Sequence, residues 1–208
     1  MPTTRTYAIA AAVLVAAGLG VGAFYAATRQ DDAADCGGGL AGASIGGPFT
    51  LVSETGETVD QAAVIDGPTL VYFGYTFCPD VCPVDAANMA QAVDLLAAQG
   101  LVVKPVFISI DPARDTPPVM ADYTEILHPT MLGLTGSAEQ VAAAAAAYKV
   151  YYARAASDDP EYYLMNHSAY IYLMTAGERF LTFFRRGDTP QTIAETTACH
   201  LRAVEGGA

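Results

Sequence analysis

The stretch Thr69-Leu-Val-Tyr-Phe-Gly-Tyr-Thr-Phe-Cys-Pro-Asp-Val-Cys-Pro83 decides how this chain folds. Its first seven residues, 69–75, are almost wholly apolar, β-branched or aromatic, which predicts a strand buried on both faces. Cys78 and Cys82 follow, with three residues between them. Pro83, which ends the stretch, suits the first position of a helix. We expect that helix to continue over residues 84–99.

Both thiols therefore lie on a strand-to-helix turn. The free N–H groups and the dipole of a helix N-terminus stabilise anions, so we expect this turn to lower thiol pKa values and to make thiolates available. Two thiolates on one tight turn can close a disulfide, exchange disulfides with a partner, or hold a soft metal ion. These residues alone leave the three uses open.

The composition limits the class of protein. A chain of 208 residues with 52% hydrophobic and 15% charged residues has enough apolar sequence for one folded domain. A formal net charge of −12 argues against nucleic acid as a partner and against docking of the folded domain on anionic lipid. Four cysteines in a chain of this length do not make a disulfide scaffold.

The N-terminal segment reads as a membrane anchor. Residues 7–27 carry no charge, and a helix of that length crosses a hydrocarbon core of about 30 Å. Arg5 precedes this run, which favours an N-terminus in the cytoplasm. We expect an uncleaved anchor at 1–28 rather than a cleaved signal peptide. An acidic and glycine-rich linker then occupies 29–44, and a folded domain occupies 45–208.

This organisation predicts a bacterial inner-membrane protein with a single span and its domain in the periplasm, since no room precedes the span for a transit peptide. The periplasm permits disulfides. Cys36 in the linker and Cys199 on the expected last helix both lie outside the central turn. We therefore expect these two cysteines to pair, which would close a long loop and stabilise the domain.

The order of expected elements defines the fold class. Three strands alternate with three helices, followed by a hairpin and a last helix, which predicts an α/β fold whose sheet is mostly parallel with an antiparallel edge. Sites in such sheets form at the carboxyl ends of the strands, where both thiols lie. A dithiol at the first strand-to-helix turn is the layout of the thioredoxin fold. The expected strands are at 69–75, 102–110 and 131–134, with hairpins at 49–59 and 169–184 and a polar loop at 153–161. The expected helices are at 84–99, 116–127, 137–148 and 189–204. Ser137 with Gln140 predicts a capping box at the start of the third of these helices.

The chain resembles the Sco/SenC family, which delivers copper to cytochrome c oxidase. The resemblance runs from about residue 45 to residue 204. Its most specific part is the CPDVCP sequence followed by SIDPxRDTP and by a histidine just before the second hairpin. The matching segments are Tyr72–Pro83, Phe107–Pro117, Gly133–Gly136, Ala147–Tyr152 and Asn166–Ser168.

The resemblance implies a ligand set. The family carries one copper ion on the two motif cysteines and on that histidine, which are Cys78, Cys82 and His167 here. Thiolates favour Cu(I), and a neutral imidazole completes a site of low coordination for either Cu(I) or Cu(II). Asn166 stands where the family commonly has Asp, so a role that needs a carboxylate at that position does not carry over.

The implied function is that of a metallochaperone rather than an enzyme. Its partner would be the oxidase subunit that carries the dinuclear copper centre, with other periplasmic copper chaperones or thioredoxin-like reductants as further partners. Two alternatives stay open: a thiol-disulfide oxidoreductase that reduces the cysteines of that centre, and a redox or copper sensor. His167 separates the metallochaperone from the oxidoreductase, because dithiol exchange needs no third ligand on another strand.

Polar residues near the central turn have expected structural roles. Asp111, Arg114 and Asp115 either form a charge network that braces their loop near the site or cap the following helix, and we favour the bracing role. Asp80, inside the motif, is expected to orient the turn through its carboxylate.

Overall fold

The structure is a computed structural model, and the anchor expected at 1–28 lies outside the residues that it describes. No helix within the described part of the chain is long and apolar enough to cross a bilayer. The chain divides into two compact units, of which one comprises residues 38–198 and the other residues 1–37 together with 199–208. The described residues are Cys36 and residues 44–157, 159, 162–177 and 179–206.

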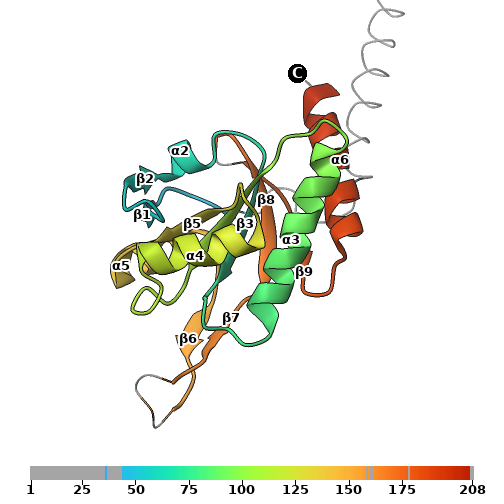
Figure 1. Ribbon diagram of the computed structural model, residues 1–208. Coiled ribbons are helices and arrows are strands. Elements are labelled where there is room, and N and C mark those ends of the chain that lie inside the picture. The colour runs from blue at the N-terminus through green and yellow to red at the C-terminus, as the bar shows by residue number, and fades with distance from the viewer. Residues whose placement is uncertain (1–35, 37–43, 158, 160–161, 178, 207–208) are drawn as a thin grey trace, which may run out of the picture. The chain divides into compact units, whose positions relative to one another are not determined.

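A seven-stranded sheet forms the larger unit, with strand order β2-β1-β5-β4-β3-β8-β9 (Figure 1). Only its centre is parallel, where β3 pairs with β4 and β4 with β5. The other pairings are antiparallel, so the expectation of a mostly parallel sheet was wrong. The first hairpin adds to β5 and the last hairpin adds to β3, which places antiparallel strands on both flanks. The strands are β1 (Thr50–Ser53), β2 (Thr58–Asp60), β3 (Thr69–Gly74), β4 (Lys104–Ser109), β5 (Leu132–Thr135), β8 (Tyr170–Thr175) and β9 (Arg179–Arg185).

The helices follow the expected order with shifted ends. The helix after the cysteine turn begins at Val81, two residues before the expected first position at Pro83, so Cys82 lies within its first turn. Pro83 is compatible with that position, because the first turn of a helix has no internal partner for the missing N–H. The expected capping box is present, with Ser137 and Gln140 each bonding the other's backbone. The helices are α2 (Gln61–Val64), α3 (Val81–Ala97), α4 (Pro117–Leu127), α5 (Ala138–Ala147) and α6 (Pro190–Gly206).

The core lies around the central strand. All six residues of β3 are buried, as the unbroken apolar run predicts. Phe73 of β3 packs against the rings of Tyr148 and Tyr172. The helices α3 and α4 lie together on the near face of the sheet in Figure 1. This packing fixes β3 and α3, and therefore the turn between them that carries both motif cysteines.

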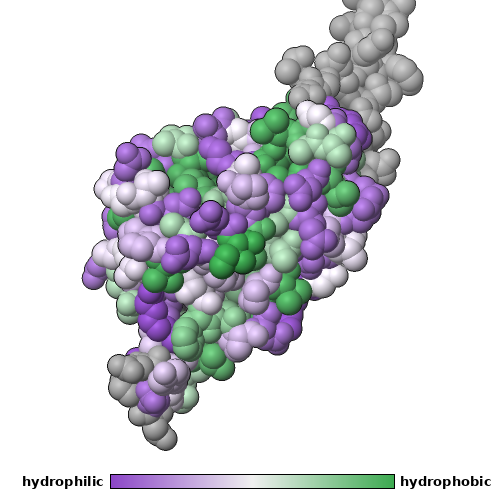
Figure 2. Space-filling view, in the orientation of Figure 1, coloured by the Kyte–Doolittle hydropathy of each residue, from purple (hydrophilic) through white to green (hydrophobic). Residues whose placement is uncertain are grey.

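A separate two-stranded hairpin carries the motif histidine. It consists of β6 (Tyr152–Arg154) and β7 (Met165–His167), paired antiparallel, with Tyr152 opposite His167. The sequence predicted a polar loop over 153–161 and missed both strands. Each strand has three residues, which is too short for an alternating pattern to be recognised. Figure 2 shows apolar residues on the visible face beside this hairpin.

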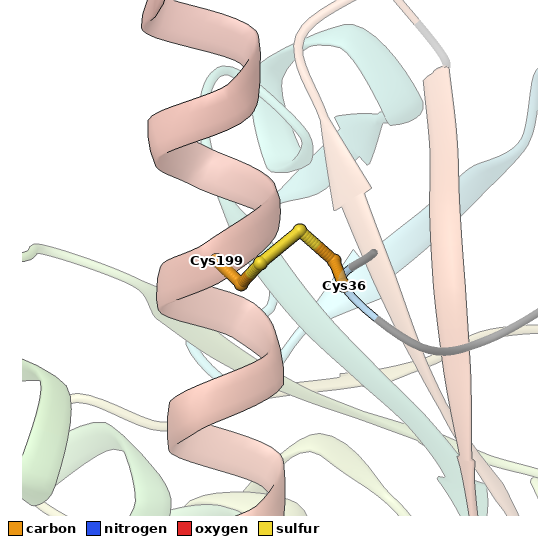
Figure 3. The surroundings of a disulfide bond; sticks show 2 residues. All are labelled: Cys36 and Cys199. Carbon is orange, nitrogen blue, oxygen red and sulfur yellow. A yellow bond between two sulfur atoms is a disulfide. The ribbon is translucent and has the colours of Figure 1, made fainter. Parts of the chain in front are cut away.

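Cys36 and Cys199 form a disulfide in the smaller unit (Figure 3). Their Cα atoms are 5.5 Å apart, within the usual range for a bridged pair, and 163 residues separate them in the sequence. The bridge joins the segment that follows the expected anchor to α6.

Candidate metal centre

The cysteine turn presents its two thiols at the carboxyl end of β3. Neither Cys78 nor Cys82 is in a disulfide; Cys78 is partly exposed and Cys82 is buried. The backbone N–H of Cys82 donates to Cys78 Sγ at 3.3 Å, so the first turn of α3 bonds to the sulfur that precedes it. Asp80 is the N-cap residue of α3, and its carboxylate makes no capping hydrogen bond. That carboxylate lies 3.8 Å from Arg186 instead, with both side chains exposed.

The two thiols differ in acidity, although the sequence predicted a lowered pKa for both. Burial acts to raise the pKa of Cys78, but the backbone N–H groups of Cys82, Asp80 and Val81 outweigh it and hold that pKa below its usual value. Burial raises the pKa of Cys82, and the neighbouring Cys78 adds to the rise. Cys78 is therefore the more acidic thiol of the turn, and Cys82 is the less acidic one.

His167 faces Cys82 from the hairpin. Its Nε2 lies 3.3 Å from Cys82 Sγ, and its Nδ1 lies 2.9 Å from the carbonyl oxygen of Ser168. A carbonyl only accepts, so Nδ1 donates and the lone pair of the neutral imidazole is on Nε2, toward the sulfur. Burial lowers the pKa of His167, which keeps the ring neutral. This is the tautomer that a metal ion needs from a histidine ligand whose other nitrogen is held by a carbonyl.

Cys78, Cys82 and His167 contact one another as two pairs, Cys78 with Cys82 and Cys82 with His167. Cys82 is the common neighbour, since its thiol interacts with Cys78 on one side and with His167 on the other. No group of three or more His, Cys, Asp or Glu side chains in the described ranges is close enough to hold a metal ion as it stands. An ion shared by all three therefore requires a side chain of this set to shift.

A polar network braces the residues just before Cys78. Asp115, which is fully buried, accepts hydrogen bonds from the backbone N–H of Thr76 at 3.1 Å and from its hydroxyl at 2.6 Å. Ser109 at the end of β4 donates to the same carboxylate at 2.6 Å. Burial raises the pKa of Asp115, and these hydrogen bonds oppose the rise. The loop after β4 thus holds the turn that carries both thiols, which matches the bracing role expected for Asp115.

The same loop also contacts the histidine hairpin. Arg114 pairs with Asp111, and Tyr163 donates to the other oxygen of Asp111 at 2.7 Å. The guanidinium of Arg114 lies 3.7 Å from the centre of the Tyr163 ring and 4.6 Å from that of Phe77, next to Cys78. One arginine therefore bridges the cysteine turn and the segment that leads to His167.

Sequence reasoning missed a buried pair behind the thiols. The hydroxyl of Tyr72 on β3 donates to Asp85 Oδ2 at 3.2 Å, and both residues are buried. The same hydroxyl interacts with the thiol of Cys82, and the Tyr72 ring stands edge-on to the ring of His167 with centroids 6.3 Å apart. The available signal was position, because Asp85 follows Cys82 by three residues and so occupies the apolar face of α3.

The fold and the site define a class. A mixed α/β domain with a reduced dithiol at the first strand-to-helix turn and a histidine facing it has the thioredoxin-like fold of Sco proteins. The SCO1/SenC family model matches residues 38–202, and the chain belongs to this family.

Relatives cover nearly the whole folded region. Protein SenC of Rhodobacter capsulatus is 48% identical over 204 residues, which cover 97% of this chain and 92% of that protein. The crystal structure of Arabidopsis thaliana ScoI with copper bound is 36% identical, with a TM-score of 0.73, and the match covers 76% of this chain and 98% of that one. Bradyrhizobium japonicum ScoI with copper bound is also 36% identical, with a TM-score of 0.67, over 76% of this chain and 99% of that one.

Proposed function

We propose that this protein binds one copper ion through Cys78, Cys82 and His167 and delivers it to the dinuclear copper centre of cytochrome c oxidase. The observation that carries the proposal is the meeting of His167 Nε2 and Cys82 Sγ at 3.3 Å, across a turn that also holds Cys78. The copper-bound structures of two relatives support copper as the metal.

The separation of Cys82 Sγ and His167 Nε2 fits two ligands of one ion. Metal bonds of roughly 2.3 Å to sulfur and 2.0 Å to imidazole nitrogen place two ligands of one ion about 3.5 Å apart, close to the separation found here. Two thiolates and a neutral imidazole form a soft set that favours Cu(I) and also accepts Cu(II). Cys78 is the more acidic thiol, and Cys82, whose pKa is raised, would have to give up a proton to ligate copper.

Delivery requires contact with an acceptor, and the rim of the site is suited to it. Phe77, Tyr162 and Leu164 are exposed large hydrophobic residues near Cys78 and the histidine hairpin, and the rings of the first two are in contact. The family resemblance supports the copper-centre subunit of the oxidase as the acceptor. Other periplasmic copper chaperones or thioredoxin-like reductants would load or reduce the site.

The proposed location is the bacterial inner membrane, with the folded domain in the periplasm and a single span at 1–28. The Cys36–Cys199 disulfide supports an oxidising compartment. After an alkaline carbonate wash, the protein should remain in the membrane pellet with its N-terminus near Met1. Release into the soluble fraction with a new N-terminus near residue 28 would contradict the anchor.

An anaerobic copper titration of the full-length protein tests the binding step. We expect one copper per chain and, with Cu(II), an intense thiolate-to-metal charge-transfer band, because two sulfurs ligate the ion. A weak band or a non-stoichiometric titration would reject the ligand set.

The asymmetry of the two thiols favours one further candidate, a thiol-disulfide oxidoreductase that reduces the cysteines of the acceptor. A partly exposed Cys78 with a lowered pKa is suited to attack a partner disulfide, and the buried Cys82 would lose its proton and resolve the mixed disulfide. This releases a reduced partner and leaves Cys78 bonded to Cys82. Rescue of a deletion strain by an added thiol reductant, without added copper, would favour this candidate.

A further inference from the structure

Asp85 is a buried carboxylate with few polar partners to offset the cost of burying its charge. Its residue exposure is 4%, and its side-chain hydrogen bond in the described part of the chain comes from Tyr72. No ion pair involves Asp85 among the residues that the structure describes, since the nearby Arg186 lies against Asp80. A buried charge without a close cation costs free energy, so such a group generally has a functional or structural reason to be there.

The surroundings of Asp85 place it behind the candidate copper ligands. It lies one helical turn after Cys82 on α3, and Tyr72, to which it is hydrogen-bonded, contacts both Cys82 and the ring of His167. Burial raises the pKa of Asp85, while the Tyr72 hydrogen bond and the charges of Arg186 and His167 oppose the rise. Asp85 is also the carboxylate whose charge acts on the pKa of His167. Asn166, beside His167 in the chain, is exposed and carries no charge.

When ionised, the Asp85 carboxylate acts differently on the two oxidation states of copper. With two thiolates and a neutral imidazole, a Cu(I) site has a net charge of −1 and a Cu(II) site has a net charge of 0. A nearby carboxylate repels the first and leaves the second nearly unaffected. Burial strengthens this effect, because water and salt screen an exposed charge more than a buried one.

The geometry points to Asp85 as a specificity-determining residue that lowers the preference of the site for Cu(I) relative to Cu(II), with Tyr72 holding its carboxylate in place. This inference rests on the proposed function, because copper is the ligand. Beyond the three proposed ligands, the inference assigns a role to a residue that does not touch the ion. That role is to select the oxidation state of the bound copper.

The test compares affinities for the two ions in full-length protein. Affinity for Cu(I) is measured anaerobically by competition with bicinchoninate, and affinity for Cu(II) by competition with a polyaminocarboxylate chelator. Asp85→Asn keeps the shape and the acceptor for the Tyr72 hydroxyl but removes the charge. We expect the ratio of Cu(I) to Cu(II) affinity to rise on the order of tenfold. The Cu(II) charge-transfer band should persist, because the ligands are unchanged.

Two controls separate charge from packing. Asp85→Glu restores the charge and should return the ratio to within about twofold of the wild type, given one added methylene in the site. Asp80→Asn removes a carboxylate that is exposed in the same turn and should change the ratio by less than about twofold, because solvent screens it.

The outcomes are distinct. An unchanged ratio in Asp85→Asn overturns the inference, and so does an equal shift in Asp85→Glu, which would mark a packing effect. A shift in Asp80→Asn as large as that in Asp85→Asn overturns it too, since any nearby charge would then suffice. Failure of the wild type to bind copper at all would instead reject the proposed function.

Discussion

The two cysteine pairs of this chain have opposite chemistry, although both consist of the same residue type in one molecule. Cys36 and Cys199 are 163 residues apart and are joined. Cys78 and Cys82 are four positions apart and are free. At the turn, the N–H groups that begin α3 bond to the Cys78 sulfur and lower the pKa of that thiol. Proximity in sequence therefore does not decide between a structural bridge and a reactive dithiol.

Removing each pair in turn should separate metal binding from structure, with the largest effect at the turn. The double variant Cys78→Ser with Cys82→Ser should lose stoichiometric copper binding, because serine oxygens are poor ligands for Cu(I). The matched double variant Cys36→Ser with Cys199→Ser should still bind one copper per chain. Stoichiometric copper binding in the variant that lacks Cys78 and Cys82 would contradict the assignment of these residues as ligands.

The bridged pair should instead contribute to stability. Loss of Cys36 and Cys199 together should lower the free energy of unfolding by about 2–4 kcal/mol, since the bridge constrains the unfolded chain over a long loop. Denaturant titration of the variant and the wild type, both without reductant, measures the difference. Peptide mapping under non-reducing conditions that finds both thiols free in the wild type would remove the basis of this prediction.

The reactive pair depends on a close approach at Gly74. A Cβ added there would lie 2.8 Å from both the Tyr72 and Phe107 rings and 3.2 Å from Cys82 Sγ. We expect Gly74→Ala to cost about 1–3 kcal/mol of stability and to weaken copper binding by displacing Cys82. Gly67→Ala is the control, because its Cβ would meet nothing within 4 Å. Equal stability and copper affinity in the two variants would show that this contact has no consequence.

Within the free pair, the two thiols should titrate in a fixed order. The pKa of Cys78 is lowered and that of Cys82 is raised, so the thiolate fraction rises first at Cys78 as the pH increases. Brief iodoacetamide pulses over a range of pH, read by mass spectrometry, measure this order. Cys78 should be labelled at pH values below the pKa of an ordinary thiol, and Cys82 only at pH values well above it. Labelling of Cys82 at a lower pH than Cys78 would contradict this order of acidity.

The sequence was most informative where one local signal acts alone. The apolar run of β3 and the capping box of α5 predicted those elements because burial and helix capping are local requirements. The sequence overestimated the parallel share of the sheet, because the residues of β1 and β8 do not indicate which neighbouring strand each one pairs with. Local patterns do not encode pairing between distant strands.

Parts of the site were beyond sequence reasoning for a similar reason. The raised pKa of Cys82 results from burial in the folded domain and from the neighbouring Cys78, whereas the helix N-terminus alone predicts the opposite direction. The pairing of Tyr72 with Asp85 depends on how α3 packs on β3. The family resemblance, rather than spacing, singled out His167, because three-residue strands leave no periodic signal.

The most direct test of copper delivery is cytochrome c oxidase activity in a strain whose only copy of this protein carries His167→Ala, grown in copper-limited medium. His128→Ala is the matched control, because His128 pairs with Asp94 away from the site. The variant keeps both turn thiols but leaves copper with two sulfur ligands. Delivery predicts loss of oxidase activity at low copper and partial recovery when copper is added. Full oxidase assembly by the variant in copper-limited medium would contradict delivery and favour thiol reduction as the main function.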